Sequence, residues 1–263
     1  MTSYLDLILE WTREHRLPRL QKSSTAGDLA RRAVEAPAVR PFRRPLASPG
    51  ISLIAEFKRR SPSAGELNPQ ADPEAQAKAY ESGGASAMSV LTEPEFFGGG
   101  FEDLLTARQS CSLPVLRKDF LLVPVQVVEA RAYSADAVLL IAAAIKDRIL
   151  LKEMCAAAEE MGMDALIEVH EEKELDLAFE VEPLLIGVNQ RDLTTFKIDH
   201  DLAIRVRKEI PDNVTVVAES GVSSPEQIQQ MRKSGIDAVL VGETLMKTED
   251  PAQAIKELLA EGE

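Results

Sequence analysis

The sequence predicts an α/β fold, a single closed (β/α)₈ barrel preceded by an N-terminal helical extension. Short apolar runs rich in Val, Ile and Leu alternate with helix-length segments from residue 51 onward, at a repeat of about twenty to thirty-five residues. These runs are apolar at nearly every position, which indicates strands buried on both faces and hence a parallel sheet covered by helices. We therefore expect two parts, an extension over residues 1–50 and a barrel over residues 51–263.

The first fifty residues differ in pattern from the rest. Leu5, Ile8 and Leu9 predict one short amphipathic helix. Ser24 or Thr25 is the expected N-cap of a second helix, which ends near residue 35. Prolines at 37, 41, 45 and 49 then predict a loop. The stretch is too short and too often interrupted by proline to hold its own core, so we expect it to pack on the barrel.

The strands of the barrel are expected at residues 52–57, 87–91, 114–116, 137–141, 165–169, 184–188, 215–218 and 238–241. Helices are expected between them, for example at 73–82, 125–133, 148–161, 171–180, 201–209 and 225–234. Strand-plus-helix units that fill about 210 residues suit a closed barrel. A doubly wound open sheet is the alternative, but it usually has a GxGxxG fingerprint after its first strand. Here the first strand is followed by Lys-Arg-Arg-Ser-Pro-Ser, which favours the barrel.

Composition and charge exclude several classes of function. The chain has 263 residues and a net charge of −13, so it lacks an overall basic surface for nucleic acid or an anionic membrane. The longest apolar run, residues 137–145, is too short to span a bilayer, and the N-terminus lacks the pattern of a signal peptide. Two cysteines and three widely separated histidines predict neither a disulfide framework nor a metal site. We expect a soluble, cytoplasmic protein that holds any anionic ligand by a local cluster of cations.

Polar residues gather at the ends of the expected strands, where the active sites of such barrels lie. The polar residues at or just beyond these ends include Glu56, Lys58, Lys118, Glu168, Asn189, Arg191 and Glu219. Alternation along the first strand puts positions 56 and 58 on one face. Any single position could be an ordinary cap or loop residue. Lysines and glutamates that converge on one mouth of an acidic protein persist mainly where they pair or act on a ligand.

Glycines after the seventh and eighth strands predict a phosphate site. Ser220-Gly221 and Gly242-Glu243 lie in the two loops that commonly bind phosphate in barrels of this kind, the second followed by a short helix. Glycine lets backbone N–H groups approach phosphate oxygens closely. The alternative is a pair of ordinary turn glycines, and the barrel context favours phosphate.

Several segments, in this order, resemble indole-3-glycerol phosphate synthase. They are residues 54–63 (IAEFKRRSPS), 89–93 (SVLTE), 96–99 (FFGG), 113–120 (LPVLRKDF), 166–170 (LIEVH), 187–193 (GVNQRDL) and 218–221 (AESG). The resemblance implies a TIM barrel that acts in tryptophan biosynthesis. Its substrate would be 1-(2-carboxyphenylamino)-1-deoxyribulose 5-phosphate, which undergoes ring closure, decarboxylation and dehydration to indole-3-glycerol phosphate, with no metal or organic cofactor.

The resemblance also implies catalytic roles. Lys118 would be the general acid for ring closure, because a proton donor at the ketone oxygen stabilises the negative charge that develops there. Lys58 would hold anionic groups of the substrate and take part in proton transfer. Glu168 would stabilise cationic character and help proton removal, and Glu56 would orient the lysines. Which of Lys58, Glu56 and Glu168 serves the dehydration stays open.

Binding roles follow in the same way. Asn189 and Arg191 would hold substrate hydroxyls or neighbouring carboxylates, and Ser61 would meet the anthranilate carboxylate. The walls around the aromatic ring would be Pro62, Leu91, Phe120 and Leu139. Phosphate would be bound by Ser220, Gly221, Gly242 and the backbone at Glu243. A phosphosugar is the expected ligand of a monomer or weak homodimer, with no nucleic acid or membrane partner.

Two other functions fit a phosphosugar barrel. One is an enzyme like phosphoribosylanthranilate isomerase, whose family has a cysteine base on the first strand and an aspartate acid on the sixth. Here the first strand carries Glu56 and Lys58, and the sixth ends in Asn189, so that acid–base pair is missing. The other is a non-catalytic phosphosugar-binding barrel, which needs cations near its ligand but no converging acid and base.

Overall fold

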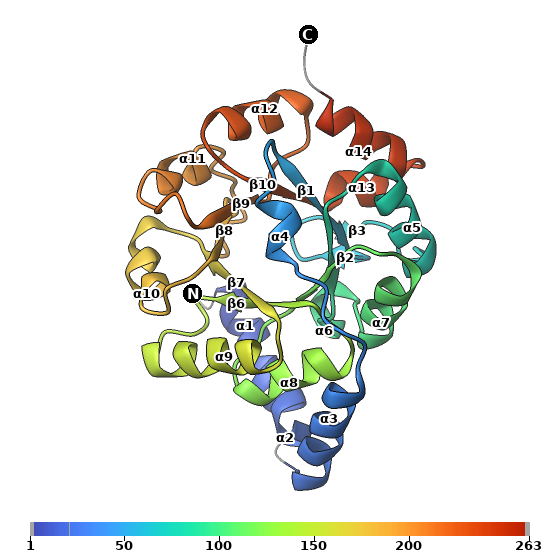
Figure 1. The fold of residues 1–263 in the computed structure, drawn as a ribbon, viewed down its shortest axis with the longest axis vertical. Helices are drawn as coiled ribbons and strands as arrows, with labels where there is room; N and C mark the ends of the chain where they lie inside the picture. Colours follow the sequence, from blue (N-terminus) through green and yellow to red (C-terminus); the bar gives the residue numbers. More distant parts are fainter. Residues whose placement is uncertain (1–2, 21, 261–263) are drawn as a thin grey trace.

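The computed structural model describes residues 3–20 and 22–260. Within them, eight parallel strands close into a barrel in the order β1-β10-β9-β8-β7-β6-β5-β4 (Figure 1). They are β1 (Ser52–Phe57), β4 (Ala87–Leu91), β5 (Val115–Lys118), β6 (Ala137–Ile141), β7 (Asp164–Val169), β8 (Leu185–Asn189), β9 (Thr215–Glu219) and β10 (Ala238–Val241). The predicted barrel is confirmed, and each strand begins and ends at the expected residue or one or two residues away.

Helices follow the strands around the outside of the barrel (Figure 1). They are α5 (Pro73–Gly83), α6 (Pro94–Phe97), α7 (Phe101–Ser110), α8 (Pro124–Ala132), α9 (Arg148–Glu160), η2 (Glu172–Glu174), α10 (Leu175–Phe179), α11 (Leu202–Arg207), α12 (Pro225–Lys233), α13 (Glu243–Lys247) and α14 (Pro251–Leu259). The prediction of one helix over 171–180 is wrong, because that segment is a 3₁₀ turn, η2, followed by the short α10. An unpredicted hairpin of β2 (Arg60–Ser61) and β3 (Gly65–Glu66) lies between β1 and α5.

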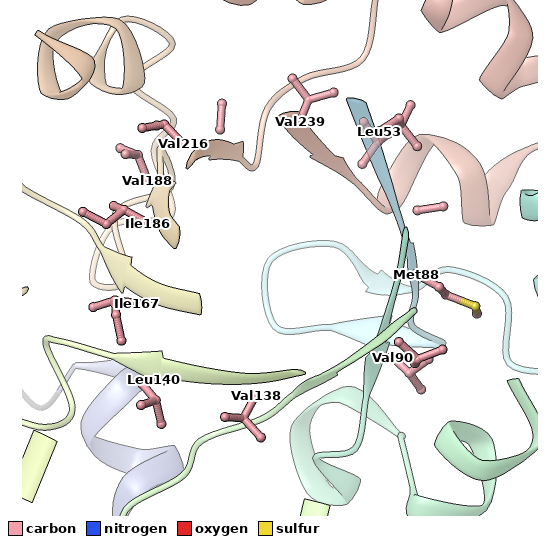
Figure 2. Close-up of a cluster of buried hydrophobic side chains, with 14 of the residues drawn as sticks. Leu53, Met88, Val90, Val138, Leu140, Ile167, Ile186, Val188, Val216 and Val239 are labelled. Atoms are coloured by element: carbon pink, nitrogen blue, oxygen red, sulfur yellow. The ribbon is translucent and has the colours of Figure 1, made fainter. Parts of the chain in front are cut away.

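Alternation along each strand divides the apolar side chains into two buried layers. The outer layer lies between strands and helices, and Figure 2 shows Leu53, Val138 and Ile186 among the side chains on the outside of the strands. The inner layer fills the barrel and includes Ile54 and Leu116, both fully buried. The barrel is therefore a packed core and not a pore.

A short helix of the extension covers the amino-terminal end of the barrel. This helix, α4 (Arg43–Leu46), lies across the middle of the ring of strands in Figure 1. Phe42 and Leu46 are fully buried and pack into the inner layer. Asp164, at the start of β7, accepts hydrogen bonds of 2.9 Å from the backbone N–H groups of Phe42 and Arg43. With this end covered, the carboxyl ends of the strands form the open mouth.

The remaining elements of the extension are α1 (Tyr4–Trp11), a π-helical turn η1 (Thr12–Arg16), α2 (Leu17–Leu20) and α3 (Ser23–Glu35). The two predicted N-terminal helices are confirmed, but the predicted cap of the second is wrong, and the segment predicted as a loop after it contains the short helix α4. Lys22 holds the cap position, and its carbonyl accepts from the N–H groups of Thr25 and Ala26 at 2.9 and 3.1 Å. Ser24 and Thr25 therefore lie inside the helix. The division into parts over 1–50 and 51–263 stays a prediction about domain organisation.

Candidate active site

Two ion-pair clusters of lysine and glutamate meet at the carboxyl end of the barrel. Lys118, the last residue of β5, places Nζ 2.5 Å from Glu168 Oε2 on β7 and 2.8 Å from Glu219 Oε2 on β9. Lys58, just after β1, places Nζ 2.5 Å from Glu56 Oε1. The carboxylates of Glu168 and Glu219 are each 2% exposed, so their charges depend on these partners.

The two carboxylates beside Lys118 have different affinities for a proton. Burial raises the pKa of Glu219, and the negative charge of Glu168 raises it further against the opposing effect of Lys118. Burial also disfavours the ionised form of Glu168, but the charges of Lys118 and His170 outweigh it and lower the pKa of Glu168. Burial opposes the charge on Lys118 as well, yet the surrounding carboxylates raise its pKa. The cluster therefore holds an ammonium, an ionised carboxylate and a carboxyl that keeps its proton to unusually high pH.

The ends of β8 and β9 carry a hydrogen-bonded polar group. Ser220 Oγ donates to Asn189 Oδ1 at 2.8 Å, and the backbone N–H of Arg191 donates to the same oxygen at 3.1 Å. Gln190 Nε2 donates to the carbonyl oxygen of Ser220 at 2.8 Å. These bonds fix the amide plane of Asn189 at the edge of the cavity.

The loops after β9 and β10 form the candidate phosphate site. Ser220 and Gly221 both have left-handed backbone, with φ of 64° and 78°. Gly242 lies so close to the Lys58–Glu56 pair that a Cβ there would be 2.4 Å from Glu56 Oε1, which only glycine avoids. Glu243 opens α13, and its side chain pairs with Lys247 at 2.5 Å. Only the backbone of Glu243 is therefore suited to an anion.

One cavity of about 550 Å³ joins these groups. Every residue singled out from the sequence lines it: Glu56, Lys58, Ser61, Pro62, Leu91, Lys118, Phe120, Leu139, Glu168, Asn189, Arg191, Ser220, Gly221, Gly242 and Glu243. The volume suits a small metabolite, and apolar walls with a few convergent polar groups are typical of binding sites. The structure thus brings the candidates together, while their individual roles stay predictions.

The extension forms part of the cavity wall. Tyr4, Leu5 and Ile8 of α1 line it. Behind them, Arg16 makes a bidentate ion pair with Asp119 at 2.7 and 2.9 Å, and Arg16 is only 5% exposed. Burial opposes the ionised form of Asp119, but Arg16 and a second buried arginine hold its pKa well below the usual range. Because Asp119 directly follows Lys118, this contact ties the extension to the end of β5.

Sequence reasoning missed several lining residues. Glu219 was noted as a strand end but not chosen as a candidate, although it is the last residue of β9 and bonds Lys118 together with Glu168. Its place at a strand end was the signal that the sequence offered, and its contact with Lys118 is visible only in the fold. The α1 residues and Lys247 were missed because no local pattern predicts where a helix of the extension docks, or which side of α13 faces the cavity.

Two absences concern residues 3–20 and 22–260, the part of the chain that the structure describes. In that part of the chain, no three or more His, Cys, Asp or Glu side chains are grouped so as to hold a metal ion. No helix described there is long and apolar enough to cross a membrane.

Fold and site together define a class of protein. Lysines and carboxylates with shifted pKa values, gathered in one cavity at the carboxyl mouth of a (β/α)₈ barrel, belong to an enzyme that moves protons on a small anionic molecule.

Comparison with known proteins identifies the family. The family model for indole-3-glycerol phosphate synthase matches residues 6–258. Indole-3-glycerol phosphate synthase of Mycolicibacterium gilvum is 45% identical over 98% of this chain and 94% of that protein. Indole-3-glycerol phosphate synthase 2 of Streptomyces coelicolor is 44% identical over 94% of this chain and 95% of its own. A mutant tryptophan synthase α-subunit from Pyrococcus furiosus shares the fold, with a TM-score of 0.59 at 19% identity over 79% of this chain and 97% of its own.

The chain belongs to the indole-3-glycerol phosphate synthase family. It is a carboxy-lyase of tryptophan biosynthesis and binds the phosphosugar substrate of that reaction. This function replaces the two alternatives considered from the sequence, the isomerase and the non-catalytic binder.

Proposed function

We propose that Lys118 is the general acid of ring closure. The observation that carries this role is the position of Nζ between Glu168 and Glu219, which keeps the ammonium protonated inside a largely buried cavity. When the aromatic carbon attacks the ketone, negative charge develops on the carbonyl oxygen, and a preorganised donor there lowers the barrier. Glu219, which retains its proton to high pH, is a reserve acid that returns a proton to Lys118.

The same cavity supplies the residues for decarboxylation and dehydration. Ring closure leaves a cationic ring that still carries the carboxylate, and loss of carbon dioxide leaves its bonding electrons in the ring. Glu168, the ionised carboxylate of the first cluster, stabilises the cationic character before that loss and accepts the proton removed in dehydration. Lys58, held by Glu56, donates a proton to the departing hydroxyl.

Binding of the substrate uses the rest of the cavity. Ser61 holds the anthranilate carboxylate, and Asn189 and Arg191 hold hydroxyls of the sugar chain. The aromatic ring lies among Pro62, Leu91, Phe120 and Leu139. Phosphate is bound by Ser220 and the backbone N–H groups of Gly221, Gly242 and Glu243.

The protein acts as a monomer or weak homodimer in the cytoplasm. Free thiols at both cysteines support a reducing compartment.

A turnover assay tests the function and the phosphate site together. Purified protein is given the carboxyphenylamino ketose phosphate, and indole emission and carbon dioxide are recorded. Both should appear in equal amounts. The same ketose without its phosphate should react with a much higher KM, because the contacts of the β9 and β10 loops are lost. Equal KM values for the two ketoses would contradict the phosphate site, and absence of carbon dioxide would contradict the reaction.

A further inference from the structure

The two oxygens of Glu168 face different partners. Oε2 lies 2.5 Å from Lys118 Nζ, and Oε1 lies 3.3 Å from His170 Nε2. Glu168 and His170 are two residues apart at the end of β7, so alternation puts both side chains on one face. Glu219 is different: its Oε2 bonds Lys118, but its Oε1 is buried and has no hydrogen-bond partner among the described residues.

His170 is fixed in place but its ring is not fully bonded. The side chain is 9% exposed, and its backbone N–H donates to Glu174 Oε2 at 2.7 Å. Neither ring nitrogen makes a hydrogen bond to any residue in the described part of the chain. A buried ring N–H left without an acceptor is costly, and Glu168 Oε1 is the carboxylate oxygen within reach of Nε2. The 3.3 Å between Nε2 and Oε1 is short enough for a hydrogen bond if the N–H points at that oxygen.

His170 does not touch the substrate cavity. It lines a neighbouring cavity of about 800 Å³ together with Glu174, Gln190 and Asp192, and it is absent from the residues that line the cavity of about 550 Å³. Glu168, which faces both His170 and the substrate cavity, is the residue through which His170 can act on the reaction.

We propose that His170 is a positioning residue for Glu168: its imidazole carries a hydrogen on Nε2, donates it to Oε1, and so turns Oε2 toward Lys118. This inference rests on the acid–base role proposed above for Glu168. The hydrogen bond from His170 also explains which of the two carboxylates beside Lys118 is ionised. Two buried carboxylates share one ammonium, and the carboxylate with the additional donor holds the negative charge, which leaves the proton on the other.

The directions of the pKa shifts agree with this division. The charge of His170 is among the causes that lower the pKa of Glu168, while burial raises that of Glu219. The cavity that His170 lines also carries Glu171, Glu172, Lys197, Asp199, Asp201 and Arg205. Lys118 from β5 and Glu219 from β9 face Glu168, while Glu174 from η2 and Asp192 from the loop after β8 face His170.

The test combines a direct probe with matched variants. In the unaltered protein, ¹⁵N NMR of the histidine ring reports which nitrogen carries the proton. His170→Leu removes the donor, whereas His170→Gln keeps an amide N–H near the place of Nε2. His15→Leu, at an exposed histidine of η1, is the control. Each variant is measured by the pH profile of kcat and by a ¹³C-NMR titration of the Glu168 carboxyl.

The expected result is a proton on Nε2 and a specific loss in His170→Leu. In His170→Leu, the apparent pKa of the acid limb of the kcat profile should rise by about one pH unit, because Glu168 loses a hydrogen bond to its ionised form. Turnover near that limb should fall about tenfold with KM little changed. His170→Gln should recover most of both, and His15→Leu should match the unaltered protein.

Other results would overturn the inference. A ring proton on Nδ1 alone would do so, even if no variant folded. So would an unchanged carboxyl titration in His170→Leu, or an equal loss in His170→Gln. If the Glu168 titration shifts while turnover stays normal, His170 positions Glu168 as inferred, and the error lies in the catalytic role proposed for Glu168.

Discussion

Replacing Lys118 by Met tests the proposed general acid most directly. The side chain keeps a similar length but loses the proton donor that faces the substrate ketone. Removal of one donor to a developing oxyanion lowers kcat by about 10²–10³, which is about 2.7–4 kcal/mol of transition-state stabilisation. Binding of the phosphosugar depends on other parts of the cavity, so KM should change much less than kcat.

The same change should alter stability in a pH-dependent way. Lys118 is the cationic partner of two carboxylates, Glu168 and Glu219, that are each 2% exposed. Loss of the ammonium leaves both carboxylates buried without that partner. Breaking a buried pair in this way costs about 3–5 kcal/mol when the remaining charge stays ionised. Burial then raises the folded-state pKa of these carboxyls above the unfolded value of about 4.3. A group with a raised folded-state pKa stabilises the protein while protonated, so the variant should lose stability as pH rises.

The assay follows indole emission during turnover and measures urea unfolding between pH 5 and pH 9. Lys152→Met is the matched control, because Lys152 lies on α9, is 53% exposed and forms a surface pair with Glu180. It should keep full turnover and stability within about 0.5 kcal/mol. Near-normal kcat in a folded Lys118→Met protein would refute the general-acid role. A stability difference that does not change with pH would refute the account of the buried carboxylates.

Three further substitutions test other parts of the site. Burial raises the pKa of Glu219, so the protein should lose stability as the pH rises through that pKa; Glu219→Gln, which mimics the protonated acid, should flatten this alkaline decline in urea titrations. Gly242→Ala would place a Cβ 2.4 Å from Glu56 Oε1, so it should cost about 1–3 kcal/mol in unfolding experiments and lower kcat/KM; unchanged kinetics would show that this contact is unimportant. Arg16→Ala removes the bidentate partner of Asp119, which keeps its ion pair with Arg117, and should cost about 1.5–3 kcal/mol, whereas a loss below about 1 kcal/mol would mean that the extension is held mainly by apolar contacts.

Local chemistry explains why so much of the fold could be predicted. Apolar runs of strand length are buried on both faces wherever a parallel sheet is covered by helices, so their ends are visible in the chain itself. Predicted helix boundaries were wrong where two local signals compete. At the start of α3, for example, Ser24 is a good capping residue, but the carbonyl of Lys22 accepts the first helical bonds.

Much of the site could also be predicted, since a closed parallel barrel brings all its strand ends to one mouth. That rule, with the family resemblance, led to Lys58, Lys118 and Glu168, which line one cavity. It could not rank Glu219, whose importance depends on burial and on the distance to a lysine 101 residues earlier in the chain.

The sequence by itself therefore determined the barrel, the residues at its mouth and the family of the enzyme, because hydrophobic periodicity and strand-end positions are properties of short stretches of chain. Only the tertiary structure decided which charges pair, which carboxyl keeps its proton, and how the extension contributes Tyr4 and Arg16 to the site. Those outcomes depend on desolvation and on distances of a few ångströms between segments far apart in sequence, and no local pattern encodes either quantity.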